Sequence, residues 1–539
     1  MTQIPAPSAL PVPASTLAAW LRDGEEIALV DIGEAGQFGE DHLLLAVNLP
    51  YSRFELDLPR RVPRLDTRLV LVSEDGKLAQ VAASAALSLG YRAVHWLEGG
   101  TAAWRGQGLK TFQGVNVPSK AFSEFVEKVY HTPDIESGEL ATRQQAGEDL
   151  VLLDSRTLEE HRRFHVPGAI SCPGSEIVTR FADLVPSPET LVVVTCAGRT
   201  RGIIGAQSLI DAGVPNRVLA LAGGTQGWRL AGLELERQPA QESKPASPQA
   251  NQVARKRAAA LEKKDALARI DLATLRQWQA DEKRTTFVFD IRTRIEYDQG
   301  HWPGAAWVQG VQLVQCLDEW VAVRNAHVVL VDTDGSRAAV TAHWLQRLGV
   351  KVALFAPPTE VAQALPAVSA VATPARRWEQ VAALSPETAR QWVQGGALVL
   401  DAGSSERYGQ AHPQDALWVN RSALSPELLS AAAAARKVVV LADHDGVARL
   451  LALSLSQLLA ADQACLQIAI LPGGLEGWQA AGLPLAEHPE LPPRAQRIDY
   501  LFWLHDRHAG NAEASAAYLQ WEADLPELVG DAQEAGYRF

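Results

Sequence analysis

Residues 192–202 read VVVTCAGRTRG, a run of β-branched residues that enters a turn carrying one cysteine, one glycine and two arginines. Such residues favour strands, and the stretch GIIGAQSLIDAG that follows at 202–213 has the pattern of a helix. A strand that leads through a short loop into a helix is the building unit of α/β proteins. The stretch therefore predicts such a unit, with Cys196 just beyond the carboxyl end of its strand.

The same pattern occurs four times along the 539 residues. In each copy an apolar strand ends in aspartate and a histidine follows eleven residues later. A second apolar strand then reaches a turn glycine 33 or 34 residues after the histidine. Alternating apolar strands and helices predict parallel sheets with helices on both faces. The aspartates are Asp31, Asp154, Asp290 and Asp401, the histidines His42, His165, His301 and His412, and three copies also carry GGxxxW.

We expect four tandem α/β domains, each a parallel sheet flanked by helices, because the copies start at irregular intervals typical of linked domains. Residues 241–264 are predicted to be a linker or a solvated helix. The last residues are predicted to form a helical tail of two amphipathic helices that turn at Gly510. The expected domains are 1–118, 119–240, 265–372 and 373–490, with the tail at 491–539.

Composition excludes several classes of function. The net charge is −13 and no dense cluster of lysine and arginine occurs, so we expect no nucleic-acid partner. No apolar run approaches the roughly 18 residues of a membrane helix, and the first residues do not resemble a secretory signal. The cysteines are scattered without metal-ligand spacing, so we expect a cytoplasmic protein without a metal or cofactor. They are Cys172, Cys196, Cys316 and Cys465.

Cys196 has the setting of a reactive thiol. A loop curling from a strand into a helix can direct several backbone N–H groups at one atom, and the helix N-terminus adds partial positive charge. Arg199 and Arg201 add full charges, so we expect a lowered pKa for Cys196 and room for a bound anion. Cys172 is interpreted as small, buried and inert, and Cys316 and Cys465 as core residues.

The repeat resembles the rhodanese domain, and CAGRTR at 196–201 resembles a rhodanese active-site loop. GHWPGA at 300–305, its variant FHVPGA at 164–169 and the GGxxxW elements are further marks of that family. The resemblance implies a sulfurtransferase in which Cys196 accepts a sulfane sulfur from a thiosulfate-like donor as a persulfide. The sulfur then passes to cyanide or a thiol, or to a protein acceptor. A protein donor is also possible.

The resemblance assigns roles to the residues around Cys196. The persulfide loop would comprise Ala197, Gly198, Arg199, Thr200 and Arg201. Arg156, at the carboxyl end of a strand, could also reach the donor anion. Asp154 and His165 have counterparts in the copies without the cysteine, so we expect them to support the structure. A cysteine-based phosphatase is disfavoured, because Gly202 occupies the position of its arginine.

The other copies lack the cysteine, with Glu74, Thr333 and His444 in its place. We therefore expect them to be inactive and to shape the entrance to Cys196 or to dock a partner. The rival hypothesis is a non-catalytic scaffold or regulator whose one reactive domain senses or carries sulfur.

Overall fold

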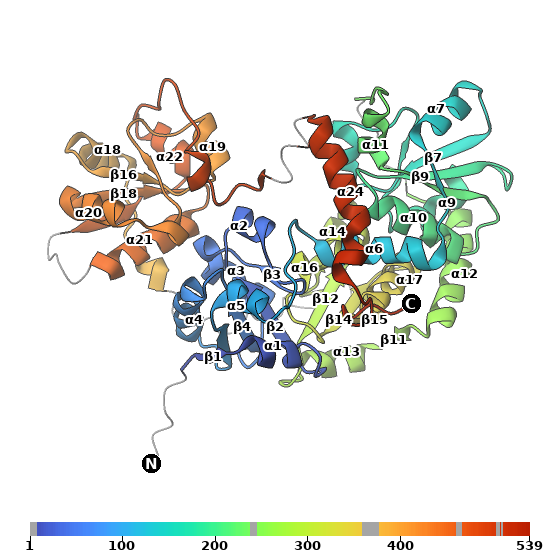
Figure 1. Cartoon of the computed structure of the whole chain (residues 1–539), viewed down its shortest axis with the longest axis horizontal. Helices are drawn as coiled ribbons and strands as arrows, with labels where there is room; N and C mark the ends of the chain where they lie inside the picture. Colours follow the sequence, from blue (N-terminus) through green and yellow to red (C-terminus); the bar gives the residue numbers. More distant parts are fainter. Residues whose placement is uncertain (1–7, 238–244, 358–376, 460–465, 503–506, 508–509) are drawn as a thin grey trace, which may run out of the picture. The chain divides into compact units, whose positions relative to one another are not determined.

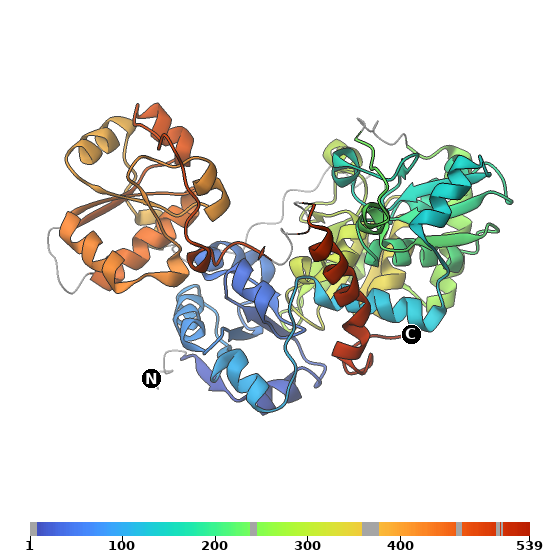
Figure 2. The ribbon, with the colours of Figure 1, turned by 45° about the horizontal axis from the view of Figure 1, so that its top comes forward.

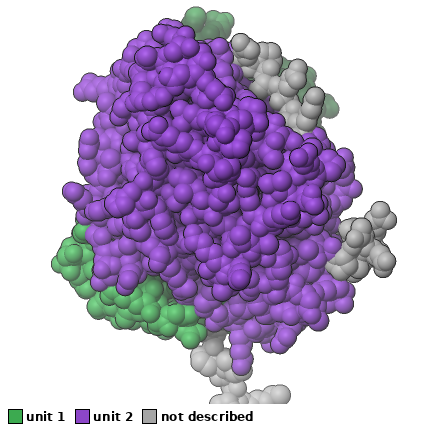
Figure 3. All heavy atoms as spheres, turned by 90° about the vertical axis from the view of Figure 1, so that its right-hand side faces the viewer, with its two compact units in different colours: residues 1–115, 370–503 green, residues 116–369, 504–539 purple. Residues whose placement is uncertain are grey.

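The computed structural model describes residues 8–237, 245–357, 377–459, 466–502, 507 and 510–539. It contains four sheets whose named strands all pair in parallel, and helices flank them, which confirms the predicted fold class. The chain divides into two compact units (Figure 3). Residues 1–115 and 370–503 hold the first and fourth copies, and residues 116–369 and 504–539 hold the second and third copies with the tail.

The first unit contains a five-stranded and a four-stranded sheet. The first sheet has the order β1 (Leu10–Val12), β5 (Val94–Leu97), β4 (Arg68–Val72), β2 (Ile27–Asp31), β3 (Val47–Asn48), and the fourth has the order β17 (Leu417–Trp418), β16 (Leu398–Asp401), β18 (Lys437–Leu441), β19 (Gln467–Ile470). Their helices are α1 (Ala14–Trp20), α2 (Ala35–Glu40), α3 (Phe54–Arg61), α4 (Lys77–Ser88) and α5 (Gly100–Gly106), then α18 (Pro386–Gln394), α19 (Ser405–Gln410), α20 (Pro426–Ala435), α21 (Asp445–Leu459) and α22 (Gly474–Ala480).

The second unit contains two five-stranded sheets of the same topology (Figure 1). One has the order β6 (Asp134–Ile135), β10 (Val218–Leu221), β9 (Leu191–Thr195), β7 (Leu150–Asp154), β8 (Ile170–Ser171), and the other β11 (Ala268–Arg269), β15 (Lys351–Phe355), β14 (His327–Val331), β12 (Thr286–Asp290), β13 (Ala306–Trp307). The helices of the second copy are α6 (Val117–Tyr130), α7 (Ser137–Gln145), α8 (Leu158–Arg163), α9 (Ile177–Leu184), α10 (Thr200–Asp211) and α11 (Gly224–Leu230). Those of the third are α13 (Leu272–Gln279), α14 (Arg294–Gln299), α15 (Gly310–Gln315), α16 (Leu317–Trp320) and α17 (Ser336–Arg347).

Strand β9 shows why both faces of its sheet must be covered. All five of its residues are buried. Val192 and Val194 point into a core shared with α9 and α10, whereas Leu191 and Val193 point into the opposite core, where Trp228 of α11 packs. The strand consequently ends in the interior of the domain and places Cys196 at the carboxyl edge of the sheet.

The segment predicted as a linker is largely a packed helix, α12 (Pro248–Asp265). Its alanines at four-residue spacing and Leu261 are buried against α9 of the second copy and α17 of the third. Small side chains allow this close approach, and charged residues cover the opposite face. The tail contains α24 (Ala512–Val529), capped by Asn511 as the expected turn requires. In the first predicted tail helix, residues 503–506, 508 and 509 lie outside the described residues.

Candidate active site

The aspartate at the end of β7 organises the backbone around the site. Asp154 is fully buried and accepts hydrogen bonds from the guanidinium of Arg156 (2.6 Å from Nη2) and from His161 Nδ1 (2.8 Å). The same Nη2 of Arg156 donates to the carbonyl of Phe164. Burial alone would raise the pKa of Asp154, but the bonds from His161 and Arg156 hold it well below its usual range.

Arg156 was considered for binding the donor anion, but its side chain is occupied by other contacts. Its side chain is 1% exposed and is engaged by Asp154 and a backbone carbonyl. Arg292 makes the same bonds to Asp290 and to the carbonyl of Gly300 in the third copy, which has no cysteine. An arrangement that occurs without the thiol serves the fold, and we assign Arg156 to structural support.

The four repeated histidines have one structural arrangement. Each Nδ1 contacts the backbone carbonyl four residues earlier, and each ring stacks on the aromatic side chain at that position, with ring centroids 3.9–4.0 Å apart. His165 stacks in this way on His161, which in turn contacts Asp154. Asp154 and His165 thus belong to one support cluster beside the site.

Cys196 lies in the loop between β9 and α10 and is 2% exposed. The backbone N–H groups of Gly198 and Gly202 act on its sulfur in the direction that lowers the pKa of the thiol. The start of α11 packs against the loop, since the N–H of Thr225 donates to the Cys196 carbonyl at 2.8 Å. Gly224 makes this approach possible, because its φ is +53° and a Cβ there would lie 2.3 Å from the Cys196 oxygen.

The two loop arginines are paired with carboxylates that the sequence patterns did not single out. Arg199 binds Glu124 at 2.7–2.9 Å and also contacts Glu127, both on α6. Arg201 is 7% exposed and binds both oxygens of Glu160 at 2.6 and 2.7 Å. Glu160 belongs to a capping box begun by Thr157, so the sequence did contain a signal for its position.

The expectation of a lowered pKa for Cys196 is not met in this structure. Burial raises the pKa of the thiol, and the nearby carboxylate of Glu522 acts in the same direction. Arg201 and the N–H groups of Gly202 and Gly198 oppose these effects but do not outweigh burial. The loop contains the groups that were predicted to lower the pKa of Cys196, but desolvation of the thiol determines the direction of the shift.

Comparison with known proteins agrees with the geometry. Residues 13–107, 137–231 and 271–356 each match the rhodanese-like domain. The chain belongs to the rhodanese-like family. A thiosulfate sulfurtransferase from Pseudomonas aeruginosa has a crystal structure similar over 98% of this chain and 99% of its own, with 38% identity and a TM-score of 0.89. A helix-turn-helix-type transcriptional regulator of Mycobacterium tuberculosis is 34% identical over 102 residues, so the chain spans 44% of that curated relative's length.

Helix α24 of the tail packs on the Cys196 loop of the second rhodanese domain, and it lies alongside α6 in Figures 1 and 2. A Cβ at Gly198 would lie 2.8 Å from Glu522 Oε2 and 3.5 Å from a methyl group of Leu519. Glycine at 198 was expected for a tight turn, but here its missing side chain makes room for α24. The sequence contained no signal that the tail reaches this loop.

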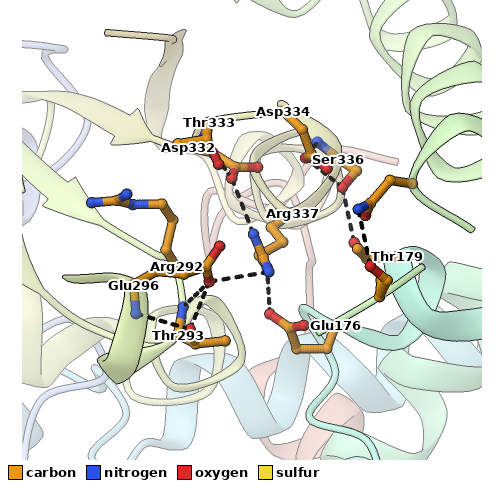
Figure 4. Close-up of polar contacts among 12 residues, drawn as sticks. Glu176, Thr179, Arg292, Thr293, Glu296, Asp332, Thr333, Asp334, Ser336 and Arg337 are labelled. Atoms are coloured by element: carbon orange, nitrogen blue, oxygen red, sulfur yellow. Dashed lines mark hydrogen bonds and ion pairs between the residues drawn. The ribbon is translucent and has the colours of Figure 1, made fainter. Parts of the chain in front are cut away.

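The start of α17, directly after the cysteine-less loop of the third rhodanese domain, contacts the second domain (Figure 4). Arg337 is 8% exposed and binds Glu176 of the second domain, with Asp332 and Glu296 nearby. Ser336 contacts Thr179 at 2.9 Å. The cysteine-less loop at Thr333 therefore adjoins an interdomain polar network, which Asp332 enters through Arg337.

The first and fourth rhodanese domains also share a buried ion pair. Arg421 binds both oxygens of Glu55 at 2.6 and 2.7 Å and lies over the ring of Tyr51. Glu74, at the cysteine position of the first domain, is exposed, whereas His444 Nδ1 accepts a hydrogen bond from the N–H of Gly446 in the fourth. Neither position carries a thiol.

The remaining cysteines differ in their surroundings. Cys172 is fully buried, and burial raises its pKa to about 12, as expected for an inert thiol. Cys316 was expected in the core but ends α15 and is partly exposed. Cys465 lies outside the described residues. No helix in the described part of the chain combines the length and apolarity needed to cross a bilayer.

Proposed function

We propose that the second rhodanese domain transfers a sulfane sulfur from a thiosulfate-like donor to a thiol or cyanide through a persulfide on Cys196. The observation that carries this proposal is the loop itself: two backbone N–H groups and Arg201 act on one cysteine sulfur. Such a cradle stabilises a thiolate and equally an anionic sulfur attached to it. The proposal includes a cytoplasmic setting, where thiol acceptors are reduced.

The proposed reaction has two steps. The Cys196 thiolate attacks the outer sulfur of thiosulfate, a new S–S bond forms, and sulfite leaves with the electron pair of the broken bond. An acceptor thiolate or cyanide then attacks the outer persulfide sulfur, and the Cys196 thiolate leaves. Ala197 and Thr200 complete the loop, and no metal or cofactor takes part.

Intact-protein mass spectrometry after treatment with thiosulfate tests this function. We expect the protein to gain one sulfur atom, which cyanide removes, and Cys196→Ser to gain none. Cys172→Ser is the matched control and should load normally, because that thiol is buried in the core. Loading of Cys196→Ser to the wild-type level would contradict the assignment.

Arg199 is expected to act on the donor. Its side chain is about one-fifth exposed, and it could exchange one glutamate contact for the sulfonate of an incoming donor. Arg199→Ala should raise the KM for thiosulfate roughly tenfold, by loss of a charge-assisted hydrogen bond. Steady-state kinetics with cyanide would measure this effect, and an unchanged KM would show that Arg199 serves only to anchor α6.

The pairing of both loop arginines with glutamates favours a second candidate, a sulfur carrier loaded by a protein donor. A carrier needs no site for a free sulfonate. Such a protein would gain sulfur slowly from thiosulfate and rapidly from a persulfide-bearing protein donor, and the two loading rates distinguish the candidates.

A further inference from the structure

We propose that Glu522 of the tail helix α24 is the general base that removes the proton from an acceptor thiol as it attacks the persulfide on Cys196. This inference rests on the proposed function and adds a catalytic group from outside the rhodanese domains. It also defines the preferred acceptor as a thiol that arrives protonated.

Position and burial single out this carboxylate. Glu522 is 2% exposed, and its Oε2 lies against the backbone of Gly198, two residues after Cys196. Within the described residues no hydrogen-bond donor reaches Oε2. The other oxygen, Oε1, accepts a hydrogen bond of 2.6 Å from the hydroxyl of Tyr518, which is itself buried.

Burying a carboxylate oxygen that receives no hydrogen bond costs free energy, so such an oxygen is a candidate for a functional role. The Tyr518 bond holds the side chain in one orientation and leaves Oε2 directed at the catalytic loop. A thiol approaching the persulfide would place its S–H within reach of this oxygen, which would supply the missing hydrogen bond.

Several charged groups lie around this carboxylate. Lys120 of α6 is buried and lies 5.2 Å from the ring centroids of both Tyr518 and Trp521, and its charge acts on Glu522. Burial lowers the pKa of Lys120 to about 8, and Glu522 opposes this shift. The other titratable groups that interact with Glu522 are Glu124, Arg199, Cys196 and Tyr518, and Arg507 lies over the Tyr518 ring, 3.7 Å from its centroid.

The chemistry balances without a further reactant. The acceptor S–H bond breaks, its proton moves to Glu522 Oε2, and the acceptor sulfur bonds to the outer sulfur of the persulfide. The persulfide S–S bond breaks and its electron pair stays on Cys196 as the thiolate. The proton on Glu522 then passes to that thiolate or to water. An acceptor that arrives without a proton, such as sulfite, needs no base.

The test measures single-turnover discharge of the full-length protein. Wild type and Glu522→Gln are loaded with polysulfide, freed of excess and mixed with 2-mercaptoethanol or with sulfite, and persulfide loss is followed by mass spectrometry. At about pH 7 we expect Glu522→Gln to discharge to the thiol about 10²-fold more slowly. The deficit should shrink at about pH 10, above the ordinary thiol pKa of about 8.5, because the thiol then ionises by itself. Discharge to sulfite should not slow.

Controls separate this role from a structural one. Glu527→Gln removes an exposed carboxylate from the same helix and should behave as wild type. Tyr518→Phe keeps the carboxylate but loses its orienting bond and should slow discharge to the thiol several-fold. If Glu522→Gln does not fold, discharge by Tyr518→Phe tests the proposal in its place. Equal slowing with both acceptors, or none with the thiol, would overturn the proposal. A wild-type protein that never loads sulfur would refute the proposed function instead.

Discussion

Replacing Asp154 by alanine should lower the free energy of local unfolding of the second domain by about 3–5 kcal/mol, because it leaves the Arg156 guanidinium buried without its partner. That side chain is 1% exposed and has its Nε and one Nη on Asp154. His161 loses a partner as well. Since the pKa of Asp154 is held low in the folded protein, its stabilisation is complete above about pH 4 and is lost as the pH falls through the folded value.

Hydrogen exchange followed by mass spectrometry would measure this effect in peptides that cover β7 and β9. Glu159→Ala is the matched control from the neighbouring helix α8. Its ion pair with Arg163 is exposed on both sides, so its loss should change stability by less than about 1 kcal/mol. Similar exchange in the two variants would mean that the buried ion pair does not support the site.

Arg201→Gln should slow sulfur loading at about pH 7 by roughly 10- to 100-fold, because loss of this charge raises the pKa of Cys196 further. Among the groups that lower the pKa of this thiol, and so oppose the effect of burial, Arg201 has the largest effect. Because only the thiolate attacks the donor, loading should accelerate with rising pH in both proteins. The pH profile of the loading rate should be shifted to higher pH in the variant than in the wild type.

Stopped-time mass spectrometry over about pH 6–10 would give both profiles with one donor. Arg201→Lys keeps the charge but loses the paired bonds to Glu160, so its profile should lie between the two. Arg163→Gln removes an exposed arginine and should leave the profile unchanged. An Arg201→Gln profile at the wild-type position would show that the loop amides alone stabilise the thiolate.

Local patterns were sufficient to predict the four α/β domains. Three short-range patterns in the sequence correspond to features of the structure. The apolar residues 192–195 lie in a buried strand, the repeated histidine stacks on a ring four residues earlier, and Gly224 of the glycine pair contacts the cysteine loop. The resemblance of CAGRTR to a known loop also identified Cys196. Helix α12 was read as a linker or solvated helix because alanines at four-residue spacing carry little hydrophobic signal.

The sequence by itself determined the fold of each copy, the single thiol that ends a buried strand and the loss of that thiol in the other three copies. Only the tertiary structure decided which groups surround the thiol. Glu124, Glu160 and Glu522 come from different helices, and no local spacing links them to Cys196. The direction of its pKa shift likewise depends on burial of the thiol and on the carboxylate of Glu522, which lies more than 300 residues away in the chain, and short-range patterns do not encode either effect.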